Sequence, residues 1–186
     1  MPLIASIQVD KVVRFKASAA LSAQAVSISD LMDLLCVATT ATNAKRLAST
    51  FRLRKIEAWA PPDSAGASVV LAIEDATSQL DFGGPSRRKE DVTMGQSRPA
   101  HLIWRPKANS VQSKWLNDQQ QATALLELTC PTGTVFDVHI SWILQDGEIP
   151  TTVTAAVSGA VAGTIYLRSL CSSTSANLPP VSFSTI

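Results

Sequence analysis

Apolar and polar positions alternate most regularly between Thr134 and Leu144. The apolar members of this stretch fall at every second position: Phe136, Val138, Ile140, Trp142 and Leu144. Successive side chains of a strand point to opposite faces of its sheet, so this pattern predicts a half-buried strand. Turn residues bound it, with Pro131–Gly133 before it and Asp146–Gly147 after it. We expect this strand near the middle of a sheet, with the five apolar side chains in the core.

Shorter stretches with the same period cover most of the chain. The further predicted strands are 11–20, 50–60, 67–75, 92–95, 99–106, 125–130, 151–157 and 164–170. In the 50–60 strand, Phe51 and Leu53 share one phase, whereas Ile56 and Ala58 share the other. Such a phase slip indicates a bulge or a strand that passes from one sheet to another.

Two short helices interrupt the strands. Ser29 or Asp30 is the predicted N-cap of a helix of about two turns, which continues through Leu31, Leu34, Leu35 and Ala38. A second helical turn is expected from Asn109–Ser110 to Trp115. Short strands without alternating long helices are typical of an antiparallel sandwich, jelly roll or barrel. The two helical insertions favour an all-β single jelly roll, with two packed four-stranded antiparallel sheets.

The length of 186 residues suits one domain. We divide the chain into an N-terminal segment 1–10, a β-domain 11–171 and a C-terminal tail 172–186. The tail ends in Leu178–Ile186, which is apolar enough to dock on its own or on a neighbouring subunit.

Only 17% of the residues are charged, against an average near 25%. This low charge fits a subunit whose flanks are covered by copies of itself, and it also fits a very apolar monomer. The net charge of +1 predicts no long-range attraction to nucleic acid or to an anionic membrane. Three cysteines without CxxC spacing argue against a disulfide framework or a zinc site. The sequence shows neither a signal peptide nor an uninterrupted membrane-length apolar run, so we expect no secretion and no membrane partner.

No catalytic or cofactor-binding motif is present, so we expect no enzyme, cofactor or metal. Asp137 and His139 lie two residues apart on one strand face, which permits a metal or acid–base pair. A surface pair at a subunit contact is the favoured interpretation, because no third ligand or nucleophile accompanies them. Asp30 and Asp33 are better explained by helix capping than by a cation site.

Basic residues cluster along the predicted strands and could contact phosphates, although charges that protect strand edges give the same pattern. The candidates for nucleic-acid contact are Lys11, Arg14, Lys16, Arg52 and Arg54. Among the tryptophans, we place Trp142 and Trp59 in the core. Trp104 and Trp115, together with Phe183 of the tail, are candidates for subunit interfaces, where aromatic residues are enriched.

Several runs of the chain resemble single-jelly-roll coat proteins of small icosahedral viruses. They are Val12–Ala17, Ser29–Leu35, Phe51–Pro62, Pro99–Leu102, Pro106–Trp115, Cys130–Ile140, Gly163–Leu170 and Leu178–Phe183. Similar coat proteins occur in environmental and invertebrate-associated RNA or single-stranded DNA viruses. The resemblance implies a shell subunit that assembles with itself around a genome in the host cytoplasm or nucleus and ends in the virion. It implies no enzymatic activity.

One departure from the family concerns the genome. Many such coat proteins carry an N-terminal arm rich in Arg and Lys, whereas the first ten residues here contain neither. We therefore expect weak binding of RNA or single-stranded DNA, without sequence specificity.

Two alternatives remain open at the level of sequence. A carbohydrate- or receptor-binding module, monomeric or trimeric, uses the same fold, but a single Tyr and 5% aromatic residues make a sugar platform hard to build. A cupin-like enzyme needs several His ligands, and this chain has two distant ones.

Overall fold

The computed structural model describes residues 7–63, 68–76, 87–108, 110–117, 123–144, 155–156, 159–172 and 175–185. The described chain is almost entirely β-structure. Its main strands are β1 (Gln8–Lys16), β2 (Leu21–Ser27), β5 (Ala48–Ala60), β6 (Val70–Asp75), β7 (Arg88–Val92), β8 (Ala100–Trp104), β9 (Ala124–Cys130) and β10 (Val135–Leu144). The smaller elements are α1 (Ile28–Met32), β3 (Leu35–Ala38), β4 (Asn43–Arg46), the 3₁₀ turn η1 (Val111–Ser113), β11 (Ala155–Ala156), β12 (Ile165–Leu167) and β13 (Pro180–Thr185).

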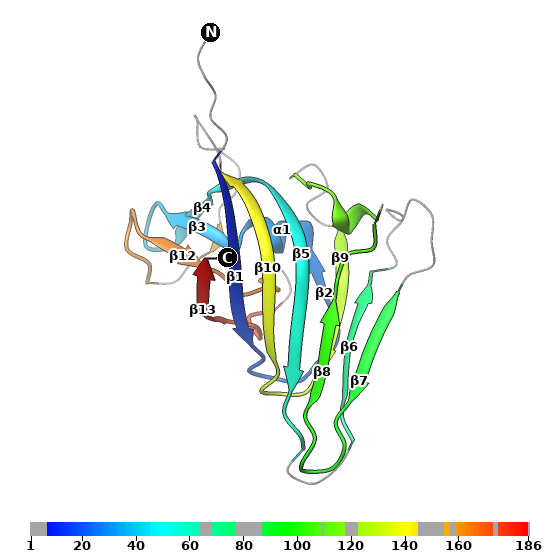
Figure 1. Cartoon of the computed structure of the whole chain (residues 1–186). Helices are drawn as coiled ribbons and strands as arrows, with labels where there is room; N and C mark the ends of the chain where they lie inside the picture. Colours follow the sequence, from blue (N-terminus) through cyan, green and yellow to red (C-terminus); the bar gives the residue numbers. More distant parts are fainter. Residues whose placement is uncertain are drawn as a thin grey trace.

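Two antiparallel sheets form the body of the molecule (Figure 1). One has the order β13-β1-β10-β5-β8 and the other has the order β2-β9-β6-β7. Apolar side chains from both sheets make a single buried cluster, as expected for a sandwich. The all-β prediction is therefore confirmed at the level of class. The expected pair of four-stranded sheets differs from the structure, because β13 adds a fifth strand to one sheet and β11-β4-β3-β12 forms a third, smaller sheet.

The 134–144 stretch forms β10, between β1 and β5 in the five-stranded sheet. Phe136, Val138, Ile140 and Trp142 are each at most 1% exposed and lie in the core. Leu144, at the end of the strand, is only half-buried. The apolar residues of the alternating pattern thus lie on the buried face of β10, except at the end of the strand.

The phase slip of the 50–60 strand is a bulge. Leu53 pairs with Ile140 and Lys55 pairs with His139, so Arg54 is an extra residue between them. On either side of the bulge the inward residues are Phe51 and Leu53, then Ile56, Ala58 and Ala60. The strand keeps one apolar face in the core because the extra residue absorbs the change of phase.

The first helix is shorter than predicted and begins earlier. Its N-cap is Ser27, whose hydroxyl accepts the Asp30 backbone N–H, while the Asp30 carboxylate accepts the Ser27 N–H. This capping box starts α1 at Ile28, and the helix ends at Met32. The residues Leu35–Ala38, which we expected to be helical, form β3 because they pair with β4 and β12. The second expected helix is only the 3₁₀ turn η1, which begins after Ser110.

An ion cluster holds the small third sheet on the body. Arg46 of β4 is 2% exposed, and its Nε lies 3.1 Å from Oδ1 of Asp33, the C-cap of α1. Arg168, just after β12, places its Nη1 3.5 Å from the other oxygen of Asp33. One carboxylate next to the helix therefore joins the inner strand β4 and the end of the outer strand β12 to the sandwich.

In the described part of the chain, no helix combines the length and the apolar character that a bilayer crossing requires.

Candidate functional site

The outward face of the five-stranded sheet carries most of the charged residues that the sequence suggested for function. We call this surface the polar face. It consists of the following residues on β1, β10, β5 and β8: Asp10, Arg14, Lys16, Arg52, Arg54, Lys55, Glu57, Trp59, His101, Asp137, His139 and Ser141. Strand register places them in rows across the sheet, such as Arg14–Asp137–Glu57 and Trp59–His101. Five are Arg or Lys and three are Asp or Glu, which leaves a formal excess of only two positive charges.

Arg14 and Asp137 form a bidentate pair across β1 and β10. Arg14 Nε and Nη2 each donate to a different Asp137 oxygen at 2.7 Å. This hydrogen-bonded partner raises the pKa of Arg14 further above its usual range. Asp137 is thus satisfied by an arginine, and the acid–base pair with His139 that the sequence permitted is not formed.

Glu57 is the centre of a second group on the polar face. Lys55 Nζ lies 2.7 Å from Glu57 Oε2, and the His101 ring nitrogen lies 3.1 Å from Glu57 Oε1. The Lys55 hydrogen bond, followed by that of His101, holds the pKa of Glu57 below its usual value. The imidazole of His101 also stacks on Trp59, with ring centroids 5.3 Å apart and an interplanar angle of 12°. Trp59 is half-buried here and does not lie in the core where we expected it.

His139 lies opposite Lys55 in the sheet. Burial, and then the nearby Lys55 ammonium, lower the pKa of His139, and the Asp137 and Glu57 carboxylates oppose this only in part. The polar face therefore gains little positive charge from His139 at pH 7.

The five candidates for nucleic-acid contact do not form one surface. Arg14, Lys16, Arg52 and Arg54 lie on the polar face, but Arg14 is held by Asp137 and Arg54 Nε donates to Ser141 Oγ at 2.9 Å. Lys11 lies on the opposite side of β1, where it lines an apolar hollow. The grouping of Lys11 with Arg14 and Lys16 is wrong, because residues an odd number apart on a strand point to opposite faces.

The three candidates for subunit interfaces have different surroundings. Trp104 is 0% exposed, and its Nε1–H donates to Asp75 Oδ1 at 3.1 Å inside the sandwich, so the expectation of an interface role is wrong for this residue. Trp115 is 37% exposed and is available to a neighbour. Phe183 belongs to β13, opposite Val13, but its side chain lies outside the described residues. The prediction had Trp59 in the core and Trp104 on the surface, and the structure has the opposite. Side chains alternate along both strands, and the sequence alone does not say which of the two alternating sets faces the core.

Side chains of β7, and of Arg87 just before it, cover the free edge of β8. The sequence did not predict this arrangement. Asp91 Oδ2 accepts the His101 backbone N–H at 2.8 Å, and Lys89 Nζ donates to the Ile103 carbonyl at 2.9 Å. Arg87 donates to the Arg105 carbonyl. The charged residues at 87–91 thus link β7, the edge strand of one sheet, to β8, the edge strand of the other sheet. A basic cluster on a strand can contact phosphates or protect a strand edge, and these bonds agree with edge protection.

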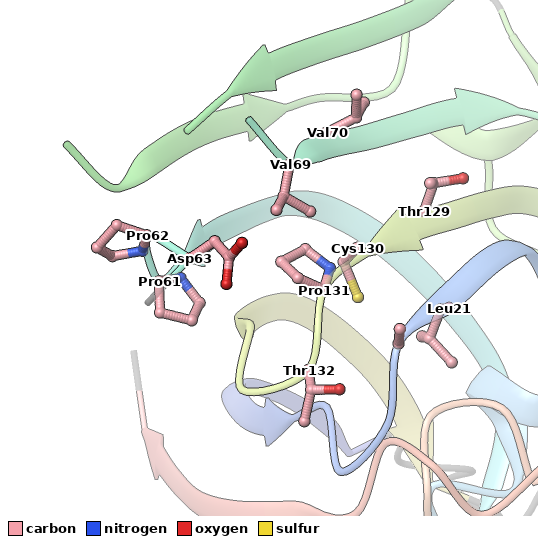
Figure 2. Close-up of a pocket in the computed structure, with 11 residues that line it drawn as sticks. Leu21, Pro61, Pro62, Asp63, Val69, Val70, Thr129, Cys130, Pro131 and Thr132 are labelled. Atoms are coloured by element: carbon pink, nitrogen blue, oxygen red, sulfur yellow. The ribbon is translucent and has the colours of Figure 1, made fainter. Parts of the chain in front are cut away.

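A hollow of about 630 Å³ lies at one end of the sandwich (Figure 2). It is lined by the ends of β2 and β9, the start of β6, and the turns at Pro61–Asp63 and Pro131–Thr132. Its ionisable groups among the described lining residues are the Asp63 carboxylate and the Cys130 thiol. Burial raises the pKa of Cys130 to about 11, so the thiol stays protonated and is a poor nucleophile. These two groups do not make a catalytic arrangement.

A smaller hollow of about 380 Å³ lies between β1 and β12. Its lining is apolar apart from Lys11 and the Tyr166 hydroxyl, and it includes Val9, Val13, Leu35, Trp142, Ile165 and Leu167. It shows that β12 packs beside β1, on the side of the sandwich where β13 is also attached.

Within the described residues, no group of three or more His, Cys, Asp or Glu side chains could hold a metal ion. A comparison of the chain with protein-family models and with curated proteins finds no match.

Proposed function

We propose that this chain is the coat-protein subunit of a small icosahedral virus and that its sandwich is a single jelly roll. The observation that carries the proposal is the nesting of the strand pairs. β1 pairs with β10, β2 with β9, β5 with β8, and β6 with β7, each pair antiparallel and each enclosed in sequence by the one before. A chain that folds back on itself in this way and then rolls into two sheets gives the strand order of a jelly roll, an architecture used by viral capsid domains.

The surface supports repeated contact with other subunits. Large apolar side chains are exposed at several separate places, among them Trp115, Val161, Ile165 and Val181. A closed shell requires each subunit to make contacts on several flanks at once, and each contact of standard size buries about 1,600 Å². Scattered apolar positions on a surface with few charges suit that requirement better than one large patch would.

The polar face supports weak capture of a genome. Arg14 and Lys55 are each paired with a carboxylate, and Arg54 is engaged by Ser141. Sequence-independent affinity for nucleic acid depends on the number of phosphates that cations neutralise, and the paired cations contribute less to it. Lys16 and Arg52 are the cations of this face that we assign to phosphate contact.

The proposal is tested by expressing the full chain and imaging the largest size-exclusion fraction by negative-stain electron microscopy. Uniform spherical shells are expected, and the ratio of absorbance at 260 and 280 nm reports whether they contain nucleic acid. A stable monomer or trimer at every salt concentration and pH would instead direct attention to a binding module, and glycan screening would follow.

The genome contact is tested separately with Lys16→Gln combined with Arg52→Gln. Shells of this double variant should form normally and contain less nucleic acid than those of the unaltered chain. Lys11→Gln is the matched control, because it removes one cation from the other side of β1. An equal loss of nucleic acid from the control would contradict the assignment of the polar face to the genome.

A further inference from the structure

Among the described strands, most sheet edges are protected in recognisable ways. Asp91, Lys89 and Arg87 cover the edge of β8, and the same charged run makes up β7. The edge strand β2 has a register shift between Leu21 and Gln24, where Ala23 has a positive φ of 46°. In the small sheet, the outer strands β11 and β12 are only 2 and 3 residues long. Charges, bulges and short length are the usual devices that prevent edge-to-edge pairing.

β13, the outermost strand of the five-stranded sheet, lacks charge on its edge. Pro180 begins it and Val181 is an extra residue between the partners of Arg14 and Phe15, so the regular part of its free edge runs from Ser182 to Thr185. The strand has 6 residues, Pro-Val-Ser-Phe-Ser-Thr, without an ionisable side chain. On one side it pairs with β1 from Lys11 to Phe15, and no described strand pairs with its other side. Val181 is 61% exposed, and Ile165 on β12, which lies across a hollow from β1, is 60% exposed. Figure 1 shows β13 on the outer side of β1, facing away from β10.

We propose that the outer edge of β13 pairs with the β13 edge of a second copy of this chain, antiparallel and about a two-fold axis. This inference rests on the proposed function and names one contact of the shell. A second copy is the occupant that suits this edge, because two identical strands related by a two-fold axis run antiparallel and present the same backbone donors and acceptors to each other. Absence of charge matters here, since an ionisable group close to the two-fold axis would lie next to its own copy. Val181 and Ile165 supply apolar area beside the ladder.

Disulfide trapping tests the contact directly. Single variants Val181→Cys, Ser182→Cys and Ser184→Cys are oxidised and run on a non-reducing gel, because the residue closest to the two-fold axis lies next to its own copy. The three native cysteines are buried and give a low background. Met94→Cys is the control, as Met94 is 60% exposed in the turn between β7 and β8. We expect a covalent dimer from at least one β13 variant and none from the control.

A second variant removes the contact without covalent chemistry. Val181→Lys places like charges on both sides of the axis and should raise the dissociation constant of the dimer about tenfold or more, measured by analytical ultracentrifugation of unassembled protein. Met94→Lys is the matched control and should leave the dimer unchanged. Equal dimerisation of the two variants would overturn the inference.

Exchange of the C-terminal strand between subunits is a different arrangement that the double variant Val12→Cys/Ser184→Cys detects. These residues are opposite each other in the β1–β13 ladder. An intrachain disulfide is expected, whereas an interchain one would show strand exchange and overturn the edge-pairing proposal. Normal shells without any β13 cross-link would also overturn it and leave the proposed function standing. Cross-linked dimers that never form shells would support the contact and count against the coat-protein proposal.

Discussion

The five-stranded sheet ends in two very different edges. At β8, Lys89 and Asp91 of β7 and Arg87 just before it bind backbone groups in β8 or directly after it, and Trp104 is anchored to Asp75 of β6. At β13, the edge strand has no ionisable residue and an exposed Val181. The β8 edge is therefore closed to further strand pairing by side chains of the same chain. The uncharged edge of β13, which is regular from Ser182 to Thr185, is a place where another chain can be added.

The largest effect should come from removing the tryptophan at the closed edge. Trp104→Ala is expected to lower the free energy of unfolding by about 3–5 kcal/mol, because it leaves a cavity and deprives the buried Asp75 carboxylate of a donor. Urea denaturation of the unassembled subunit measures it. Trp115→Ala is the matched control on an exposed tryptophan and should change stability by less than about 0.5 kcal/mol.

The expected role of Trp115 in a subunit interface can be tested separately. If it is buried between subunits, Trp115→Ala should fold normally and yield fewer shells in the electron micrographs. Normal yields of shells would remove Trp115 from the interface, as the fully buried Trp104 has already been removed.

A smaller effect is expected from uncovering the β8 edge. Asp91→Ala leaves the His101 N–H without its carboxylate acceptor and should cost about 1 kcal/mol of stability. Asp91→Ala combined with Lys89→Ala should also increase aggregation, which light scattering detects, because the free edge becomes a template for pairing. Glu90→Ala is the control, since its carboxylate binds Arg88 of its own strand and not β8.

The Asp91 contribution should depend on pH in a defined direction. The backbone hydrogen bond from His101 is the main reason that the pKa of Asp91 lies below its ordinary value of 3.8. A lowered carboxyl pKa contributes stability that is fully present above the unfolded value, here 3.8, and is lost as the pH falls through the lower folded value. The stability difference between the unaltered chain and Asp91→Asn should therefore shrink below about pH 4. A constant difference down to acid pH would contradict the role given to the ionised carboxylate.

The smallest effect concerns the polar face between the two edges. In the unassembled subunit, the His139 ring should titrate below 6.5, as measured by NMR. Lys55→Gln should raise that pKa only in part, because burial is the larger cause and Lys55 the second. Arg88→Gln, which alters an exposed side chain of β7, should not move the His139 titration.

Much of the fold was predictable because local rules determine it. The alternation of Phe136, Val138, Ile140 and Trp142 predicted a buried central strand, and the structure places β10 between β1 and β5. The change of phase before Ile56 predicted either a bulge or a strand that changes sheets, and the register with His139 and Ile140 shows that it is a bulge. The helix was less predictable, because apolar residues such as Leu35 satisfy a helix and a short strand equally well. Pairing with β12 decided in favour of β3.

By itself, the sequence determined the all-β class, most of the strands and the residues that each strand sends to one of its two faces. Only the tertiary structure decided which of those faces is buried. For this reason Trp104 is buried although an interface was expected, and Trp59 is half-buried although the core was expected. For the same reason Lys11 lies on the opposite side of β1 from Arg14. The same holds for the two edges, because the bonds from Asp91 and Lys89 to β8, and the pairing of β13 with β1, join residues whose proximity depends on strand order. The physical reason is that side-chain alternation is a local property of the backbone, whereas burial and edge pairing depend on which distant segment lies alongside.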